Sequence, residues 1–87
     1  MNWDSHTQEK FKLMISRMPV FHRRIAEEAV TLKAQENANA RGAALVSEED
    51  VISALFSDVP TPFYSLMIRL LEDVGFDYRK YGYPVKR

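Results

Sequence analysis

The sequence contains no cysteine, and this absence removes several kinds of chemistry at once. Without cysteine the chain forms no disulfide, offers no thiolate nucleophile and supplies no sulfur ligand to zinc or to an iron–sulfur cluster. We therefore expect this chain to bind no cofactor of its own. The composition also fits the reducing environment of the cytosol.

A net charge is missing too, because 12 Lys and Arg residues balance 12 Asp and Glu residues in the 87-residue chain. No overall electrostatic attraction draws it toward nucleic acid or an anionic membrane. No apolar run approaches the ~20 residues of a transmembrane helix, and the first stretch, MNWDSHTQEK, has no signal-peptide core. We expect one small, soluble, cytoplasmic domain whose partner is another protein, not a membrane or nucleic acid.

Apolar residues recur at helical spacing along most of the chain, and the few prolines and glycines divide it into segments. The pattern predicts four helices, over about residues 5–18, 20–40, 47–59 and 61–74. Residues 43–46 are expected to be extended. The predicted fold class is therefore all-α: a single domain over 1–87 that forms a small bundle of about four short helices, followed by an irregular aromatic and basic C-terminal tail.

Each predicted helix has an apolar stripe that we expect to be buried. The stripes are Phe11, Met14, Ile15 and Met18; Phe21, Ile25, Ala29 and Leu32; Val51, Ile52, Leu55 and Phe56; and Phe63, Met67, Leu70 and Val74. The second stripe is widened by Ala26, Val30 and Ala34, and the fourth is flanked by Leu66 and Leu71. The caps are equally recognisable. Asp4 or Ser5 opens the first helix, Ser47 with Asp50 at its third position opens the third, and Gly75 ends the fourth.

The start of the second helix carries an unusual group of cations. His22, Arg23 and Arg24 follow a proline, although the first turn of a helix disfavours positive charge. One interpretation is an anion site, formed by the guanidinium groups and the free backbone N–H groups. The other is that the arginines pair at i,i+4 spacing with Glu27 and Glu28 on a solvated surface. The sequence leaves both open.

The tail alternates aromatic and cationic residues, including Tyr78, Arg79, Lys80 and Tyr81, with Lys86 and Arg87 at its end. Such residues can stack nucleic-acid bases and neutralise phosphates, or they can cover one end of the bundle. We favour packing, because the remainder of the chain has no net positive charge.

No catalytic or metal site is recognised elsewhere. The two histidines, His6 and His22, lie on different predicted helices, and no further ligand stands at a metal-binding spacing. No serine lies in a nucleophile-elbow motif. The adjacent acids are interpreted as solvated surface: Glu27 with Glu28, Glu48 with Glu49, and Glu72 with Asp73.

Several of these features resemble a known family when they are taken in order. They are Trp3, the MPVFHRR segment at 18–24, Glu28, Ala34, Gly42 and the VSEEDVISAL segment at 46–55. Together they resemble the small C-terminal accessory domain of the B subunit of light-independent protochlorophyllide reductase, a nitrogenase-like enzyme. The resemblance covers about residues 3–55, and residues 60–87 lie outside it as an extra helix and tail.

The resemblance implies a non-catalytic, free-standing copy of this accessory domain. The family enzyme reduces a ring double bond of protochlorophyllide with electrons delivered through iron–sulfur clusters, which are held by domains that this chain lacks. The implied role is docking on a redox protein or binding an anionic or tetrapyrrole ligand. The implied binding residues are Pro19, Phe21, His22, Arg23 and Arg24, although the family's second aromatic after the proline is missing here.

A second analogy points to a different class of protein. The segment NARGAALVSEEDVISAL, residues 39–55, is similar to the end of a histone fold, where a long helix passes through a short strand into a capped helix. The alternative is therefore a histone-fold-like dimer that binds DNA through Arg23, Arg24, Arg41 and the tail cations.

Overall fold

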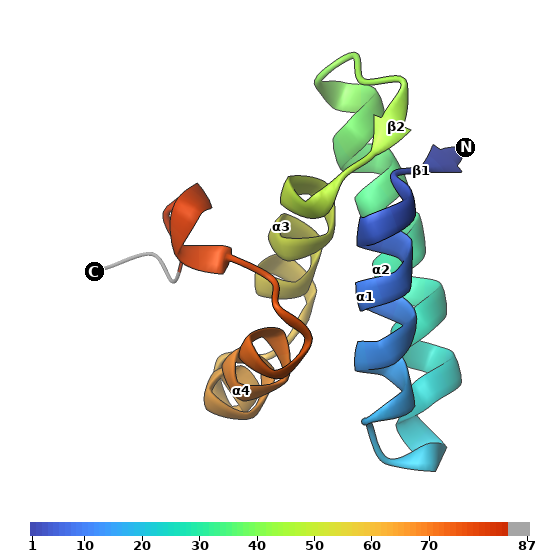
Figure 1. Cartoon of the computed structure of the whole chain (residues 1–87). Coiled ribbons are helices and arrows are strands. Elements are labelled where there is room, and N and C mark those ends of the chain that lie inside the picture. The colour runs from blue at the N-terminus through green and yellow to red at the C-terminus, as the bar shows by residue number, and fades with distance from the viewer. Residues whose placement is uncertain (84–87) are drawn as a thin grey trace.

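The computed structural model describes residues 1–83 as four α-helices with short connections and two short strands at one end (Figure 1). In chain order the elements are β1 (Asn2–Trp3), α1 (Ser5–Ser16), α2 (Val20–Ala40), β2 (Leu45–Val46), α3 (Glu48–Asp58), the 3₁₀ turn η1 (Thr61–Phe63), α4 (Tyr64–Val74) and the 3₁₀ turn η2 (Tyr78–Tyr81). The predicted all-α bundle is confirmed. Lys86 and Arg87, two of the tail cations, lie outside the described residues.

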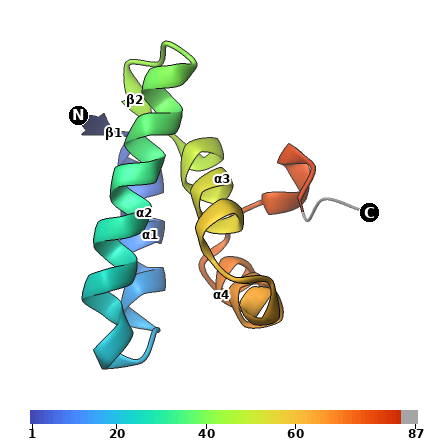
Figure 2. The same cartoon turned by 180° about the vertical axis from the view of Figure 1, so that it is seen from behind.

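The helices surround one core. α1 and α2 run antiparallel and side by side, α3 packs on α2, and α4 lies beside α1 (Figures 1 and 2). The centre of the core consists of fully buried side chains from α1, α3 and α4: Met14, Ile52, Leu55 and Leu71. Within residues 1–83, no helix has both the length and the apolar character that crossing a membrane requires.

α1 begins at the predicted place because Asp4 caps it. The Asp4 Oδ2 atom accepts hydrogen bonds from the Thr7 backbone N–H (3.0 Å) and from the Thr7 hydroxyl (2.9 Å). The first of these bonds satisfies one of the backbone N–H groups that the first helical turn leaves without a partner. The predicted buried stripe is confirmed at Phe11, Met14 and Ile15.

The two strands join the N-terminus to the middle of the chain. β1 and β2 pair in parallel, with Trp3 opposite Val46, and the Asp4 N–H donates to the Val46 carbonyl (2.9 Å). The Trp3 ring stacks on Phe11 at 5.5 Å between centroids. The extended segment before Ser47 was therefore predicted correctly, but its strand partner at the N-terminus was not.

α3 agrees most closely with its prediction. Ser47 and Asp50 form the capping box, in which Asp50 Oδ2 accepts from the Ser47 backbone N–H at 2.9 Å. All of the apolar residues predicted to be buried on this helix are buried: Val51, Ile52, Leu55 and Phe56.

α4 begins later than predicted. The sequence suggested Thr61 as the N-cap, but residues 61–63 form a 3₁₀ turn, closed by a hydrogen bond from the Phe63 N–H to the Pro60 carbonyl (2.9 Å). This turn takes Phe63 out of the buried stripe, and the side chain is 57% exposed. Gly75 ends the helix as predicted, in the left-handed conformation with φ 86°. The buried residues of α4 are Met67, Leu71 and Val74.

The C-terminal segment packs against the bundle as far as Tyr83. Phe76 and Tyr78 are buried, and the Tyr83 ring stacks on Phe56 at 4.7 Å between centroids. The predicted packing of the tail aromatics is confirmed for these residues. The segment is also more regular than predicted, because η2 forms within it.

α2 contradicts its predicted buried face. Phe21, Ile25, Ala29 and Leu32 are all exposed. The buried side chains lie on the opposite side of the helix and are smaller: Val30, Ala34 and Ala38. Of these, Val30 and Ala34 were predicted as the margin of the buried face, and they are its centre. Helical spacing fits both sets, so periodicity could not choose between them. Small side chains decide the packing, because they let the backbone of α2 approach its neighbours closely.

Candidate interaction surface

The turn between α1 and α2 explains why one of the two adjacent arginines, Arg23, stands at the start of a helix. Pro19 occupies the N-cap of α2, and the carbonyl groups at the end of α1 have no helical partners. Arg23 reaches back across this turn. Its Nε donates to the Met18 carbonyl (2.9 Å) and its Nη2 to the Ser16 carbonyl (2.7 Å). Because a cation is favoured at the C-terminal end of a helix, Arg23 stabilises the end of α1.

Arg24 lies on the solvent side of α2 and pairs within its own helix. Its Nε is 3.3 Å from Glu28 Oε2, and the two side chains are 88% and 70% exposed. A pair this exposed contributes only about 0.3–0.5 kcal/mol to stability. Of the two i,i+4 pairs that the sequence suggested, the structure therefore contains Arg24–Glu28, whereas the hydrogen-bond partners of Arg23 are backbone carbonyls.

The five predicted binding residues do not converge on one pocket. Phe21 and His22 lie side by side on the exposed first turn of α2, with ring centroids 4.4 Å apart. Arg24 is exposed one turn further on, whereas Arg23 points back toward α1. Pro19 and Arg23 thus shape the turn, and the other three residues face solvent.

Phe21 belongs to a longer apolar surface, the outer face of α2, which we define as Val20, Phe21, Ile25 and Leu32. These side chains are 75%, 76%, 70% and 61% exposed. With 3.6 residues per turn, Phe21, Ile25 and Leu32 fall within about 40° of one another around the helix. In Figure 2, α2 stands in front of α1, and no other element of the described chain covers its outward side.

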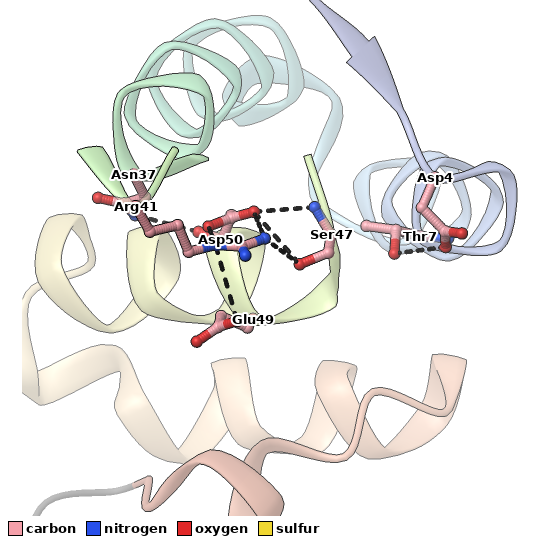
Figure 3. Close-up of polar contacts among 7 residues, drawn as sticks. All are labelled: Asp4, Thr7, Asn37, Arg41, Ser47, Glu49 and Asp50. Atoms are coloured by element: carbon pink, nitrogen blue, oxygen red, sulfur yellow. Dashed lines mark hydrogen bonds and ion pairs between the residues drawn. The ribbon is translucent and has the colours of Figure 1, made fainter. Parts of the chain in front are cut away.

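A polar cluster joins the other end of α2 to the start of α3 (Figure 3). Arg41 donates to both carboxylate oxygens of Asp50, from Nε at 2.8 Å and from Nη2 at 2.7 Å. The same guanidinium donates to the Ser47 hydroxyl (2.8 Å) and lies 3.7 Å from Glu49 Oε1. Asn37 donates to the Asp50 backbone carbonyl at 3.1 Å. The helix ends are therefore fixed to each other.

The charge state of Asp50 follows from these contacts. Its side chain is 1% exposed, and burial alone raises the pKa of the carboxyl group. Hydrogen bonds from Arg41 and from the Ser47 backbone N–H outweigh burial, so the pKa of Asp50 lies below its ordinary value of 3.8. The hydrogen bond to Asp50 in turn raises the pKa of Arg41. A carboxylate held in this way is structural, because a general base needs a pKa nearer to neutrality.

Glu48 has a role that the sequence did not reveal. It was interpreted as solvated surface, but its Oε1 lies 3.4 Å from Lys10 Nζ on α1 and its Oε2 accepts from the Asp77 backbone N–H at 2.8 Å. Lys10 also donates to the Gly75 carbonyl at 3.1 Å. These contacts tie α1, α3 and the C-terminal segment together, and sequence spacing gives no signal for them because the partners lie far apart along the chain.

The tail residues proposed as contacts interact with α4 or with one another. The Tyr78 hydroxyl donates to Glu72 Oε2 at 2.6 Å, and this hydrogen bond raises the pKa of Tyr78. The Arg79 guanidinium lies 3.8 Å from the same carboxylate. The Lys80 ammonium lies 5.6 Å from the centre of the Tyr81 ring. These contacts make the segment a packed part of the fold as far as it is described.

A shallow, open hollow of about 330 Å³ lies between the end of α2, α3 and the C-terminal segment, where Arg41, Glu49 and Tyr81 border it. Burial raises the pKa of the Tyr81 hydroxyl. Of the residues that the sequence singled out for binding, Tyr81 and Arg41 line this hollow. Its charged walls are already paired with each other through Arg41, so the hollow offers a ligand few free groups.

The fold and these surfaces define a small all-α domain with an apolar helix face turned to solvent. Among residues 1–83, no three His, Asp or Glu side chains are grouped so that they could hold a metal ion. Comparisons with models of known protein families, with curated proteins and with solved structures find no match to this chain.

Proposed function

We propose that this protein is a non-catalytic interaction domain that binds another protein through the outer face of α2. The observation that carries the proposal is the distribution of side-chain size around this helix. The small residues face the core, and the large ones, Phe21, Ile25 and Leu32, face solvent at 61–76% exposure. Burying a large apolar side chain contributes about 1.5–3 kcal/mol. The isolated fold leaves these side chains in water, so a partner that covers them gains this free energy on binding.

The family resemblance supports the same region and suggests the kind of partner. The MPVFHRR segment, residues 18–24, carries part of the resemblance to the protochlorophyllide reductase accessory domain, and it also begins the outer face of α2. On this basis the partner class is a redox protein, and any iron–sulfur cluster or tetrapyrrole belongs to that partner.

The other forms of the hypothesis have less support. An anion or tetrapyrrole at the start of α2 would meet only His22 and Arg24, because Arg23 is hydrogen-bonded to α1. The DNA-binding alternative stays a prediction without a supporting contact. Two of its cations, Arg23 and Arg41, are held by partners within the chain.

Photocrosslinking in the native cell tests the proposal. A photoreactive amino acid placed at Phe21 or Ile25 is expected to give a protein adduct, whose identity mass spectrometry then establishes. The same group placed at Lys12, an exposed residue of α1, serves as the control and is expected to give no such adduct. Ile25→Lys introduced beside a probe at Phe21 is expected to abolish the adduct. If neither outer-face position yields an adduct beyond that of Lys12, the proposal is wrong.

A further inference from the structure

We propose that the outer face of α2 binds the same face of a second copy of this chain, with the two α2 helices antiparallel about a two-fold axis. This inference rests on the proposed function and names a second occupant of the same face, so that self-association and binding of the other protein use the same residues. It follows from three features of the face: where its apolar residues stand along the helix, how its charges are arranged, and how large it is.

The spacing of the apolar residues fits an antiparallel pair. A helix rises about 1.5 Å per residue, so an axis at the level of Ala26 places Phe21 of one copy within about 1.5 Å, along the helix, of the level of Leu32 of the other. The two Ile25 side chains then meet beside the axis. Each large side chain of the face thereby meets an apolar side chain of the second copy, as a self-complementary two-fold interface requires.

The charges on the same face are self-complementary in the same register. Arg24 and Glu28 are both exposed and stand one turn apart on one edge of the apolar stripe. Reversal about the level of Ala26 brings Arg24 of each copy to the level of Glu28 of the other, which gives two reciprocal attractions across the interface. A parallel two-fold arrangement instead puts the two charged edges on opposite sides of the interface, so neither reciprocal attraction forms. The formal net charge of zero adds no long-range repulsion between copies.

The size of the outer face of α2 sets the expected affinity of the two copies for each other. It is one helix wide, with large apolar residues between 20 and 32, so the contact falls below the roughly 800 Å² per partner of a standard stable interface. We therefore expect a reversible monomer–dimer equilibrium with a dissociation constant in the micromolar range.

Analytical ultracentrifugation of the full chain over micromolar to millimolar concentration tests the dimer. The wild type is expected to dimerise, and Ile25→Glu to raise the dissociation constant at least tenfold. Leu66→Glu, at a comparably exposed apolar residue of α4, is the matched control and should leave the constant unchanged. Circular dichroism establishes that both variants remain folded, as expected for exposed positions.

Charge reversal and cysteine crosslinking test the register. Arg24→Glu and Glu28→Arg should each weaken self-association, and an equimolar mixture of the two variants should associate more tightly than either alone. Because the chain has no cysteine, Phe21→Cys mixed with Leu32→Cys should form a mixed disulfide. Phe21→Cys alone should not, since its two sulfur atoms would be about 15 Å apart along the helices.

Three outcomes overturn the inference. They are a monomer at every concentration, a dimer that Ile25→Glu leaves intact, and a Phe21→Cys disulfide that forms more readily than the mixed one. A monomer that still gives an adduct from Phe21 in the cell removes the second copy and retains the proposed function. The absence of both an adduct and a dimer removes both.

Discussion

Arg23 and Arg24 are adjacent in sequence, yet they have different surroundings. Arg23 donates to the carbonyls of Ser16 and Met18, so its charge belongs to the end of α1, while Arg24 pairs with Glu28 in solvent. Positive charge at the start of α2 is unfavourable when it is considered with respect to that helix alone. The turn at Pro19 brings two helix ends within reach of one side chain, and the favourable end is the one that Arg23 contacts.

We predict that Arg23→Ala lowers the free energy of unfolding by about 1 kcal/mol, because it removes hydrogen bonds from a charged donor to carbonyls without helical partners. Urea unfolding followed by circular dichroism measures the change. Arg24→Ala is the control and should cost less than about 0.5 kcal/mol, since it removes an exposed pair. Equal losses in the two variants would contradict the role assigned to Arg23.

Asp50 makes stability depend on pH in acid. Its pKa is lowered in the folded state, so its contribution is present above the unfolded pKa of about 4 and is lost as pH falls through the lower folded pKa. We predict that the difference in unfolding free energy between wild type and Asp50→Asn is larger at pH 7 than at pH 2. Urea titrations at the two pH values measure it. A difference independent of pH would show that Asp50 is not held as a carboxylate.

α2 shows where prediction from periodicity reaches its limit. Its length and ends were predicted, because Pro19 and Gly42 mark them in the sequence. The centre of its buried side was not predicted, because apolar residues stand on opposite sides of the helix and Val30 and Ala34 were placed only at the margin of the predicted face. The row of Val30, Ala34 and Ala38 was the signal available, since small residues at helical spacing indicate close packing between helices. The candidate site was affected in the same way: Phe21, Ile25 and Leu32 were all placed in the buried stripe, and only Phe21 was also identified as a binding residue.

We predict that the two sides of α2 respond differently to truncation. Val30→Ala should lower the free energy of unfolding by about 2 kcal/mol, because the side chain is 3% exposed and the change leaves a cavity. Ile25→Ala should change it by less than about 0.5 kcal/mol, because the side chain is already in solvent. Thermal unfolding at a protein concentration well below the dissociation constant expected for self-association, where the monomer predominates, measures both. A larger loss for Ile25→Ala would place that residue in the core instead.

Segments at both ends of the described residues, 1–83, pack onto the helices. β1 pairs with β2, Trp3 stacks on Phe11, and Tyr78 and Tyr83 of the C-terminal segment pack against Phe56 of α3. Phe76 of the same segment is buried in the core. An 87-residue chain has a stability of roughly 4–13 kcal/mol at typical values per residue. Each buried aromatic side chain of the C-terminal segment therefore contributes a large fraction of the total free energy of unfolding.

We predict that Phe76→Ala lowers the free energy of unfolding by about 3 kcal/mol or more and the melting temperature by at least about 10 °C. The side chain is 3% exposed and belongs to the core, although it lies beyond the last helix. Phe63→Ala, at 57% exposure, is the control and should change the melting temperature little. Calorimetry measures both, and a small effect of Phe76→Ala would mean that the tail does not contribute to the core.

The sequence by itself determined the four helices and most of the points where they start and end. Those features depend on neighbouring residues: Asp4 and Ser47 as caps, Pro19 as a break, and Gly75 as a terminator. Only the tertiary structure decided which side of α2 is buried, which helix end Arg23 contacts, and which partners hold Glu48 and Asp50. These outcomes depend on groups that are distant along the chain and become neighbours only when the helices pack. For that reason three residues of the surface proposed for binding, Phe21, Ile25 and Leu32, were predicted from the sequence to be buried in the core.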